Sequence, residues 1–142
     1  MLMVKHLLER KPRDLWSIEP DEPVLEAIQV MADRHIGALP VVRGDELVGI
    51  VSERDYARKV ILLGRSSAET PVWQIMSSPV TTVTPDETVH RCMQIVTEQR
   101  IRHLPVVNAG RLSGIISIGD LVKAVIEDQQ QTIEQLERFI AS

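Results

Sequence analysis

Apolar side chains follow two different patterns along this chain, and each pattern predicts a different kind of element. Helical spacing (i, i+3, i+4, i+7) starts at Val24 and again at Val89, and it predicts two amphipathic helices of about three turns each. Short continuous apolar runs predict buried strands at residues 39–42, 47–51, 104–107 and 112–116. Residues with high β-propensity predict two further short strands at 15–18 and 80–83.

These elements occur in the same order twice, at an offset of 65 residues and without a gap from Pro20 to Ile61 of the first copy. Each copy reads strand, helix, strand, strand, helix, and apolar residues starting at Val4 and Val72 predict a short helix ahead of each copy. The short helices are offset by 68 residues, so the first copy has three extra residues, within the polar segment 9–14. Because about 60 residues bury little apolar surface, we expect the two sheets to pack together in a mixed α/β (α+β) fold of two β-α-β-β-α repeats.

We place the first repeat at residues 1–65, the second at 66–127 and a C-terminal helical extension at 128–142, with a Gly-, Ser- and Pro-containing linker at 63–71. The last helix continues through the extension with a 4-3 spacing that contains one polar member: Val122, Ile126, Gln129, Ile133, Leu136 and Ile140. This spacing has two open interpretations. Either the helix packs on its own domain, or it forms a short seam between two subunits in which Gln129 fixes the register.

Composition narrows the classes of function. The 142 residues are 44% hydrophobic and 25% charged, and the formal charge of −4 argues against a general nucleic-acid-binding protein. Any anionic ligand must therefore be held by local groups. The single cysteine, Cys92, lies at an apolar position of a predicted helix and is expected to be a buried structural thiol. No apolar run reaches the ~18 residues of a membrane span, and no signal peptide is evident, so we expect a cytoplasmic protein.

The familiar catalytic and metal-binding patterns are absent from the sequence. It has no Gly-x-Ser-x-Gly, no Walker loop and no His-Glu-x-x-His, and its four histidines lack the spacing of metal ligands. The acidic pairs Asp21-Glu22 and Asp86-Glu87 follow prolines at helix starts, where the helix dipole explains them. The chain is therefore predicted to be no enzyme and to carry neither a metal nor a catalytic cofactor.

One duplicated motif remains as a candidate for chemistry, Ser52-x-x-Asp55 and Ser117-x-x-Asp120, each between a predicted strand and a predicted helix. It has two interpretations. Ser-x-x-acid is the pattern of a helix capping box, although the acid there is usually Glu or Gln. Alternatively, a carboxylate beside the free N–H groups of a helix N-terminus accepts two hydrogen bonds from the cis-diol of a ribose. A glycine three residues before each serine (Gly49 and Gly114) allows a close approach to the backbone.

The duplicated order of helix, strand, Pro-Asp-Glu, helix, Leu-Pro-Val-Val, turn and Gly-Ile-x-Ser-x-x-Asp resembles a tandem pair of cystathionine-β-synthase-type (CBS) domains. The resemblance covers Val4 to about Ile126, and the chain is most similar to free-standing bacterial CBS-pair proteins. It implies a pseudo-two-fold pair of repeats with two clefts between them. In this family the clefts bind adenosine-type ligands (AMP, ADP, ATP, NAD(H) or S-adenosylmethionine), and the pairs dimerise into a flat disc.

The resemblance also implies roles for individual residues. Asp55 and Asp120 would hold the ribose of a ligand, with hydroxyl contacts from Ser52 and Ser117. For the Asp120 cleft, the base would lie against the first repeat, and the phosphates would meet cations of the second repeat. The residues in question are Ser17, Ile18, Gly37 and Ala38 for the base, and Arg102 and His103 for the phosphates. Since the first repeat has Gly37 and Ala38 where the second has Arg102 and His103, the two clefts are predicted to differ.

Three further cations, Arg54, Arg58 and Lys59, accompany Asp55 in the predicted helix, where positions 55, 58 and 59 share one face. That face either receives phosphates, from a second nucleotide or from a partner subunit, or is a solvent-facing surface with ordinary charges. Both interpretations stay open.

Together these features predict a homodimeric, non-catalytic sensor of adenine nucleotides that acts on an unidentified regulated protein. The dimer would form through the CBS-pair helices, with the C-terminal helix as a second contact. The alternative is a protein-interaction and dimerisation module without nucleotide, in which Ser52 and Ser117 only cap helices. A nucleotide hydrolase is the weakest alternative, because it needs a base near the phosphates and His103 is the one candidate.

Overall fold

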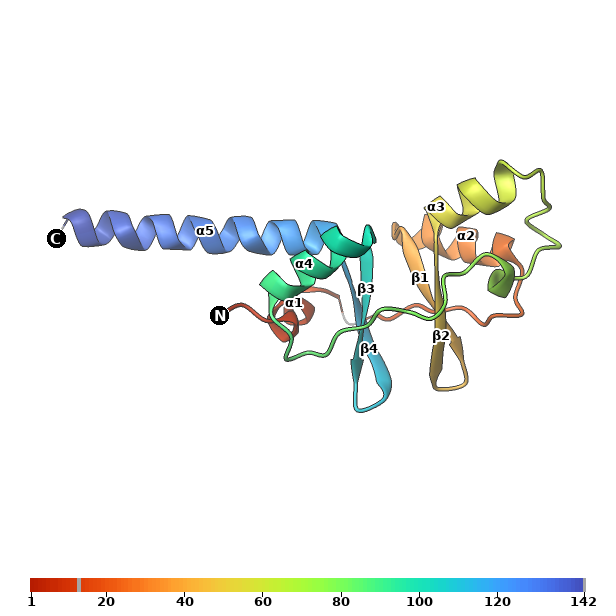
Figure 1. The fold of residues 1–142 in the computed structure, drawn as a ribbon, viewed down its shortest axis with the longest axis horizontal. Helices are drawn as coiled ribbons and strands as arrows, with labels where there is room; N and C mark the ends of the chain where they lie inside the picture. The colour runs from red at the N-terminus through yellow and green to blue at the C-terminus, as the bar shows by residue number, and fades with distance from the viewer. Residues whose placement is uncertain (13, 142) are drawn as a thin grey trace.

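The computed structural model describes residues 1–12 and 14–141. Two small antiparallel sheets stand side by side, and both hairpin turns lie at one end of the molecule, away from the helices α2, α3 and α5 (Figure 1). The helical elements are α1 (Val4–Arg10), α2 (Val24–Arg34), α3 (Glu53–Tyr56), η1 (Ala57–Ile61), η2 (Val72–Gln74), α4 (Val89–Gln99) and α5 (Ile118–Ala141). The strands are β1 (Ala38–Arg43), β2 (Glu46–Ser52), β3 (His103–Asn108) and β4 (Arg111–Ser117).

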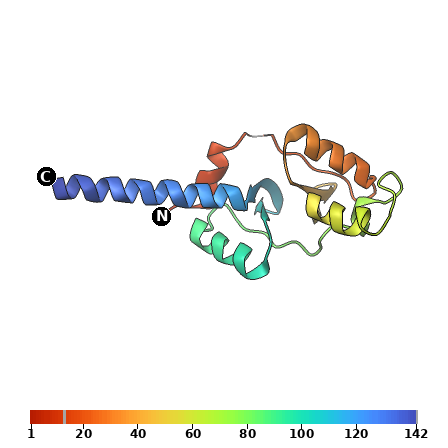
Figure 2. The ribbon, with the colours of Figure 1, turned by 90° about the horizontal axis from the view of Figure 1, so that it is seen from above.

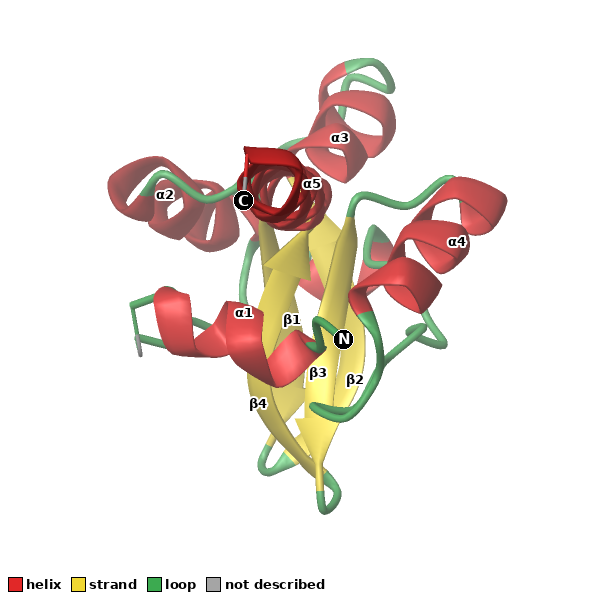
Figure 3. Ribbon diagram, turned by 90° about the vertical axis from the view of Figure 1, so that its left-hand side faces the viewer, coloured by secondary structure: helices red, strands yellow, loops and turns green. Residues whose placement is uncertain are grey.

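The backbone confirms the duplication. β1 pairs with β2 and β3 with β4, and the register is the same in both sheets at the offset of 65: Ala38 faces Ser52, and His103 faces Ser117. Each sheet also carries a bulge at the equivalent place. The sheets contact each other through β2 and β4, and the helices surround the strands when the molecule is viewed along its long axis (Figure 3). The predicted mixed fold of two repeats with packed sheets is therefore confirmed.

The short strands predicted at 15–18 and 80–83 are wrong, because each segment makes only one parallel bridge. Ile18 donates to the Pro40 carbonyl (3.1 Å) and accepts from the Val42 N–H (2.9 Å). The next ladder bonds on either side would need N–H groups from Pro40 and Pro20, which proline lacks. Val83 makes the same single bridge, between Pro85 and Pro105.

Each repeat completes its core with a segment that precedes the other repeat in the chain. Val4 and Leu7 of α1 are buried in the core of the second repeat, while Val72 and Ile75 are buried in the core of the first. Backbone bonds hold this exchange, since Val4 donates to Glu87 (2.9 Å) and Val72 donates to Glu22 (2.9 Å). The short helices predicted at these positions therefore form, the second as a 3₁₀ turn, but each serves the opposite repeat.

The glycines that precede the two serines are required by this packing. A Cβ on Gly114 would lie 2.6 Å from Leu8 Cδ2 of α1. A Cβ on Gly49 would collide with Met76 Sδ and lie 3.1 Å from the Ser77 carbonyl oxygen. The close approach predicted at these glycines therefore exists, and the groups that approach are the side chains of the exchanged segments.

Cys92 is fully buried in the second core, as predicted. Burial, with a smaller contribution from the nearby Glu87, raises the pKa of its thiol to about 11, so little thiolate forms at neutral pH. Its role is packing.

The helix α5 leaves the body of the molecule after its first turns (Figures 1 and 2). Leu121 and Ala124 are buried against the domain, whereas the predicted 4-3 stripe faces solvent. Its exposed fractions are 41% at Val122, 59% at Ile126, 48% at Ile133, 57% at Leu136 and 81% at Ile140. The interpretation in which this stripe packs on its own domain is therefore wrong. The predicted boundary at 127/128 stays a prediction, because α5 runs through it without a break.

We expect Gly49→Ala to lower the free energy of unfolding by about 1–3 kcal/mol, because the added methyl group overpacks Met76 and the Ser77 backbone. Urea denaturation checks this. Gly119→Ala is the control: its Cβ would meet only Ser117 Oγ, at 3.5 Å, and alanine favours the helix, so its stability should equal or exceed the wild type. A Gly49→Ala protein as stable as the wild type would contradict the packing argument.

Candidate functional site

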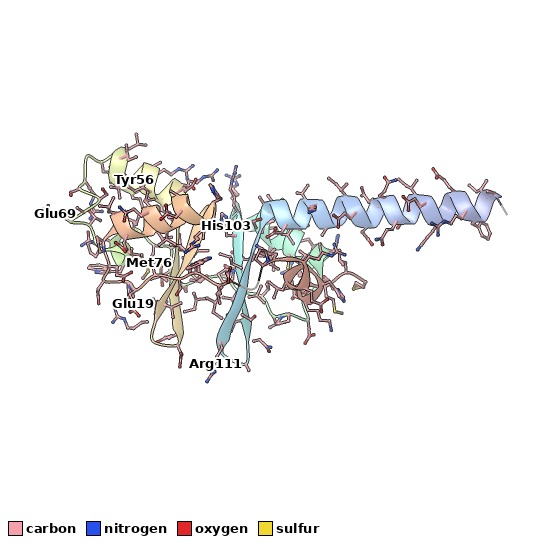
Figure 4. The ribbon with its side chains drawn as sticks, turned by 180° about the vertical axis from the view of Figure 1, so that it is seen from behind. Glu19, Tyr56, Glu69, Met76, His103 and Arg111 are labelled. Atoms are coloured by element: carbon pink, nitrogen blue, oxygen red, sulfur yellow. The ribbon has the colours of Figure 1, made fainter. Side chains whose placement is uncertain are left out.

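A cleft of about 650 Å³ opens where the two repeats meet, within the size range of ligand sites, roughly 300–1,000 Å³. Both repeats line it, and His103 lies between the two halves of the molecule (Figure 4). From the first repeat the lining is Gly37, Ile50, Ser52, Glu53, Arg54, Asp55 and Arg58; from the second it is Ser77, Pro79, Val80, Thr81, Gln99, Arg100, Ile101, Arg102, His103, Ser117 and Ile118. A molecule in this cleft would touch both repeats.

The charge of the cleft is opposite in sign to that of the whole chain. Four arginines line it, at 54, 58, 100 and 102, against two carboxylates, Glu53 and Asp55. The chain as a whole carries −4. A concave site lined by excess cations attracts anions, so the cleft favours an anionic ligand.

Ser52 and Asp55 form the predicted capping box at the start of α3. The Asp55 N–H donates to Ser52 Oγ (3.1 Å), and the Ser52 N–H donates to Asp55 Oδ2 (3.0 Å). Ser52 Oγ also donates to the same Oδ2 (3.0 Å). The other carboxylate oxygen, Oδ1, is 3.4 Å from Lys59 Nζ, and Lys59 itself donates to the Ile75 carbonyl (2.9 Å). The cap thus occupies one oxygen of a carboxylate that also lines the cleft.

Ser117 and Asp120 repeat the cap at the start of α5, with one added partner. The Ser117 N–H donates to Asp120 Oδ2 (2.8 Å), and Lys11 Nζ donates to the same oxygen (2.7 Å) and to the Ile115 carbonyl (2.8 Å). Burial acts to raise the pKa of the Asp120 carboxyl, but the hydrogen bonds from Lys11 and Ser117 outweigh it and hold the pKa below its usual value. Asp120 is outside the lining of the cleft described above.

The residues predicted around Asp120 are distributed differently from the expectation. Arg102 and His103 line the same cleft as Asp55, and so does Gly37, where an added Cβ would lie 3.6 Å from His103 Nε2. Ile18 and Ala38 are buried hydrophobic residues, and Ser17 is exposed. Of the cations predicted beside Asp55, Arg54 and Arg58 line the cleft, whereas Lys59 contacts Asp55 from the same helix.

Sequence reasoning missed five polar residues of the cleft: Glu53, Ser77, Thr81, Gln99 and Arg100. Arg100 ends α4 in the left-handed conformation (φ 55°), directly before Ile101-Arg102-His103. Thr81 Oγ1 donates to Gln99 Oε1 (2.6 Å) across the cleft wall. A signal for Arg100 was present, since three of the four residues 100–103 are basic or histidine.

His103 is half-buried in the lining of the cleft. Burial lowers the pKa of its imidazole, the charges of Lys11 and Arg102 lower it further, and Asp120 opposes them. The imidazole is therefore neutral at pH 7.

No helix among the described residues is long and apolar enough to cross a membrane. Nor do the described residues contain a group of three His, Cys, Asp or Glu side chains able to hold a metal ion.

The known proteins that resemble this chain contain the same kind of domain. The family description of the CBS domain matches residues 4–61 and again 72–127. A CBS domain-containing protein of Arabidopsis thaliana, the mitochondrial CBSX3, is 42% identical over 131 residues, which cover 89% of this chain and 63% of that protein. The chain thus spans less than two thirds of that relative.

Solved structures resemble the chain closely. A protein from Burkholderia ambifaria described as a signal-transduction protein with CBS domains is 50% identical, with a TM-score of 0.85 over 89% of this chain and 96% of that one. A hexameric CBS-CP12 protein from bloom-forming cyanobacteria is 26% identical, with a TM-score of 0.78 over 98% of this chain and 86% of that one.

The lowered pKa of His103 makes stability depend on pH. Below pH 6.5 the imidazole of the unfolded chain binds a proton that the folded chain excludes, so stability falls as the pH drops from 6.5 toward the lower folded pKa, by up to about 1.4 kcal/mol per pH unit. We expect His103→Gln to flatten this slope between pH 5 and 6.5 in urea denaturation. The exposed His90→Gln variant should keep the wild-type slope. Equal slopes for wild type and His103→Gln would contradict the assignment.

Proposed function

Because the chain belongs to the CBS-domain family, we propose that it is a non-catalytic sensor that binds an adenine nucleotide in the cleft lined by Asp55. The observation that carries the proposal is the convergence of four arginines and one capped aspartate in a single cleft that both repeats line. Proteins of this family are generally regulatory, nucleotide-binding modules.

The ribose of the nucleotide would be recognised by Asp55. Since Oδ2 is engaged in the cap, Oδ1 is the oxygen that accepts from the cis-diol, in competition with the 3.4 Å contact of Lys59. A hydrogen bond to a charged group contributes roughly 1.5–3 kcal/mol. Ser52, whose hydroxyl already donates to Asp55, keeps the carboxylate oriented.

The phosphates would be held by the arginines of the cleft. Arg102 and Arg100 come from the second repeat and Arg54 and Arg58 from the first, so a phosphate group bridges the repeats. The excess of cations favours AMP, ADP, ATP or NAD(H) over S-adenosylmethionine, whose sulfonium adds a positive charge. A ligand bound by both repeats stabilises one relative orientation of them according to its differential affinity, and a regulated protein would respond to that orientation.

The proposed sensor is a homodimer, and the exposed stripe of α5 supports a second copy as its partner. With Ile126, Ile133 and Ile140 at heptad position a, the apolar layers of two antiparallel α5 helices align along their full length. In that orientation the e positions pair Lys123 with Glu137 of the opposite helix, which are complementary charges. Gln129 of each helix faces Ile133 of the opposite helix, which gives two mixed layers at the centre.

Thermal melting against AMP, ADP, ATP, NAD, NADH and S-adenosylmethionine tests the nucleotide proposal. A ligand at 100 times its Kd adds about 2.7 kcal/mol, which is several degrees in Tm. Asp55→Asn, which keeps an acceptor for the cap, should weaken binding by about ten-fold or more. The control Asp86→Asn removes an 82% exposed carboxylate and should bind as the wild type does. No shift with any compound, on protein freed of nucleotide beforehand, would favour the interaction module.

Ile133→Glu in the stripe should dissociate the dimer, because it places a carboxylate in the apolar seam. Sedimentation equilibrium measures the change, expected as a rise in the dimer dissociation constant of ten-fold or more. Gln131→Glu, at heptad position f on the side of α5 away from the stripe, is the control. An unchanged dimer in Ile133→Glu would place the interface on other helices.

A further inference from the structure

The offset of 65 assigns each residue of the open cleft a counterpart around Asp120, and the counterparts differ in chemistry. Arg102 corresponds to Gly37 and Arg54 to Gly119, so two arginines become glycines. Thr81 and Gln99, which form a 2.6 Å hydrogen bond, correspond to Trp16 and Arg34. Arg34 instead stacks on the Trp16 ring, 3.8 Å from its centroid. The other two arginines of the cleft, Arg58 and Arg100, correspond to Lys123 and His35, so the Asp120 side has fewer arginines than the Asp55 side.

In addition to these replacements, a lysine, Lys11, contacts Asp120. It lies in the polar segment 9–14, which contains the three extra residues of the first copy. Its ammonium donates to Asp120 Oδ2 (2.7 Å) and to the Ile115 carbonyl (2.8 Å), and both charged side chains are half-buried. The backbone that leads to it is anchored, since Arg10 pairs with Glu127 of α5 at 2.8 Å.

Lys11 and the cap both engage Oδ2 of Asp120. A ribose that takes this oxygen would have to displace the ammonium, leaving a half-buried lysine without its counter-ion. Asp55 presents a weaker obstacle, because its lysine, Lys59, lies 3.4 Å away and is outside hydrogen-bond distance of a charged pair. The two carboxylates thus differ in the distance to their lysine partners, and the side chains around them differ in charge.

From this geometry we infer that Lys11 is the internal occupant of the Asp120 cleft and limits the chain to one nucleotide, bound at Asp55. The inference rests on the proposed function and specifies its regulation. Lys11 takes the place of the ligand on Asp120, and removal of its charge makes that cleft available to a second nucleotide.

Isothermal titration calorimetry with ATP, and separately with AMP, tests the stoichiometry on the full chain. The wild type should bind one nucleotide per chain, and Asp55→Asn should weaken that site at least ten-fold. Lys11→Met keeps the length and apolar stem of the side chain and should bind two nucleotides per chain. In the double variant Lys11→Met/Asp55→Asn one site should remain, and Asp120→Asn should remove it. Lys5→Met, an exposed lysine of α1 that is 3.6 Å from Asp86, is the matched control and should bind one.

The outcomes separate the two proposals. Two nucleotides in the wild type, or one in folded Lys11→Met, would overturn the role of Lys11 and leave the sensor intact. If Lys11→Met does not fold, Asp55→Asn decides alone: a full-affinity site that Asp120→Asn abolishes would overturn the inference. If neither nucleotide binds the wild type or any variant, the proposed function fails and the inference fails with it.

Discussion

The architecture depends on the exchange of short segments between the repeats. A unit of about 60 residues buries too little apolar surface to be stable alone, and each repeat here takes two buried side chains from the segment ahead of the other, Val4 and Leu7 in one direction and Val72 and Ile75 in the other. Because the exchange runs in both directions, the two repeats cannot separate without opening both cores. This explains why the cleft between them is a fixed feature of the fold, with walls from distant parts of the chain.

The parts of the fold that depend on neighbouring residues could be predicted from the sequence. The helices starting at Val24 and Val89 and the four hairpin strands follow from spacing alone, because each buries one face against a single core. The first strands failed for a reason that was also local: Pro20 and Pro40 withhold the N–H groups that would extend the bridge at Ile18. The partner of each exchanged helix is a long-range property, and the spacing of apolar residues in α1 gives no information about which repeat it will cover.

The candidate site likewise combines features that follow from neighbouring residues with features that depend on long-range contacts. The duplicated Ser-x-x-Asp motif was visible, and its two interpretations turn out to be compatible, since the cap uses Oδ2 of Asp55 and leaves Oδ1 facing Lys59. Arg102 and His103 were visible as cations and were expected beside Asp120. The structure places both in the lining of the Asp55 cleft, and His103 also interacts with the charge of Asp120. The pairing of Lys11 with Asp120 joins residues 109 positions apart and follows no periodic pattern. Only coordinates could place it.

The two repeats share their backbone and their Ser-x-x-Asp motif, and they differ in the side chains around the two carboxylates. Arg54 and Arg102 of the Asp55 cleft correspond to glycines, and Thr81 and Gln99 correspond to the stacked Trp16–Arg34 pair. On the Asp120 side, Lys11 contacts the carboxylate itself. The Lys11 ammonium and the cap together engage Oδ2 of Asp120 and hold the pKa of that carboxyl below its usual value. A carboxylate that is already paired within the protein stabilises the fold. It then gains little binding free energy by accepting hydrogen bonds from a ribose. The asymmetry between the repeats thus gives the Asp120 side a structural role. It concentrates positive charge, in a protein of net negative charge, at the cleft lined by Asp55.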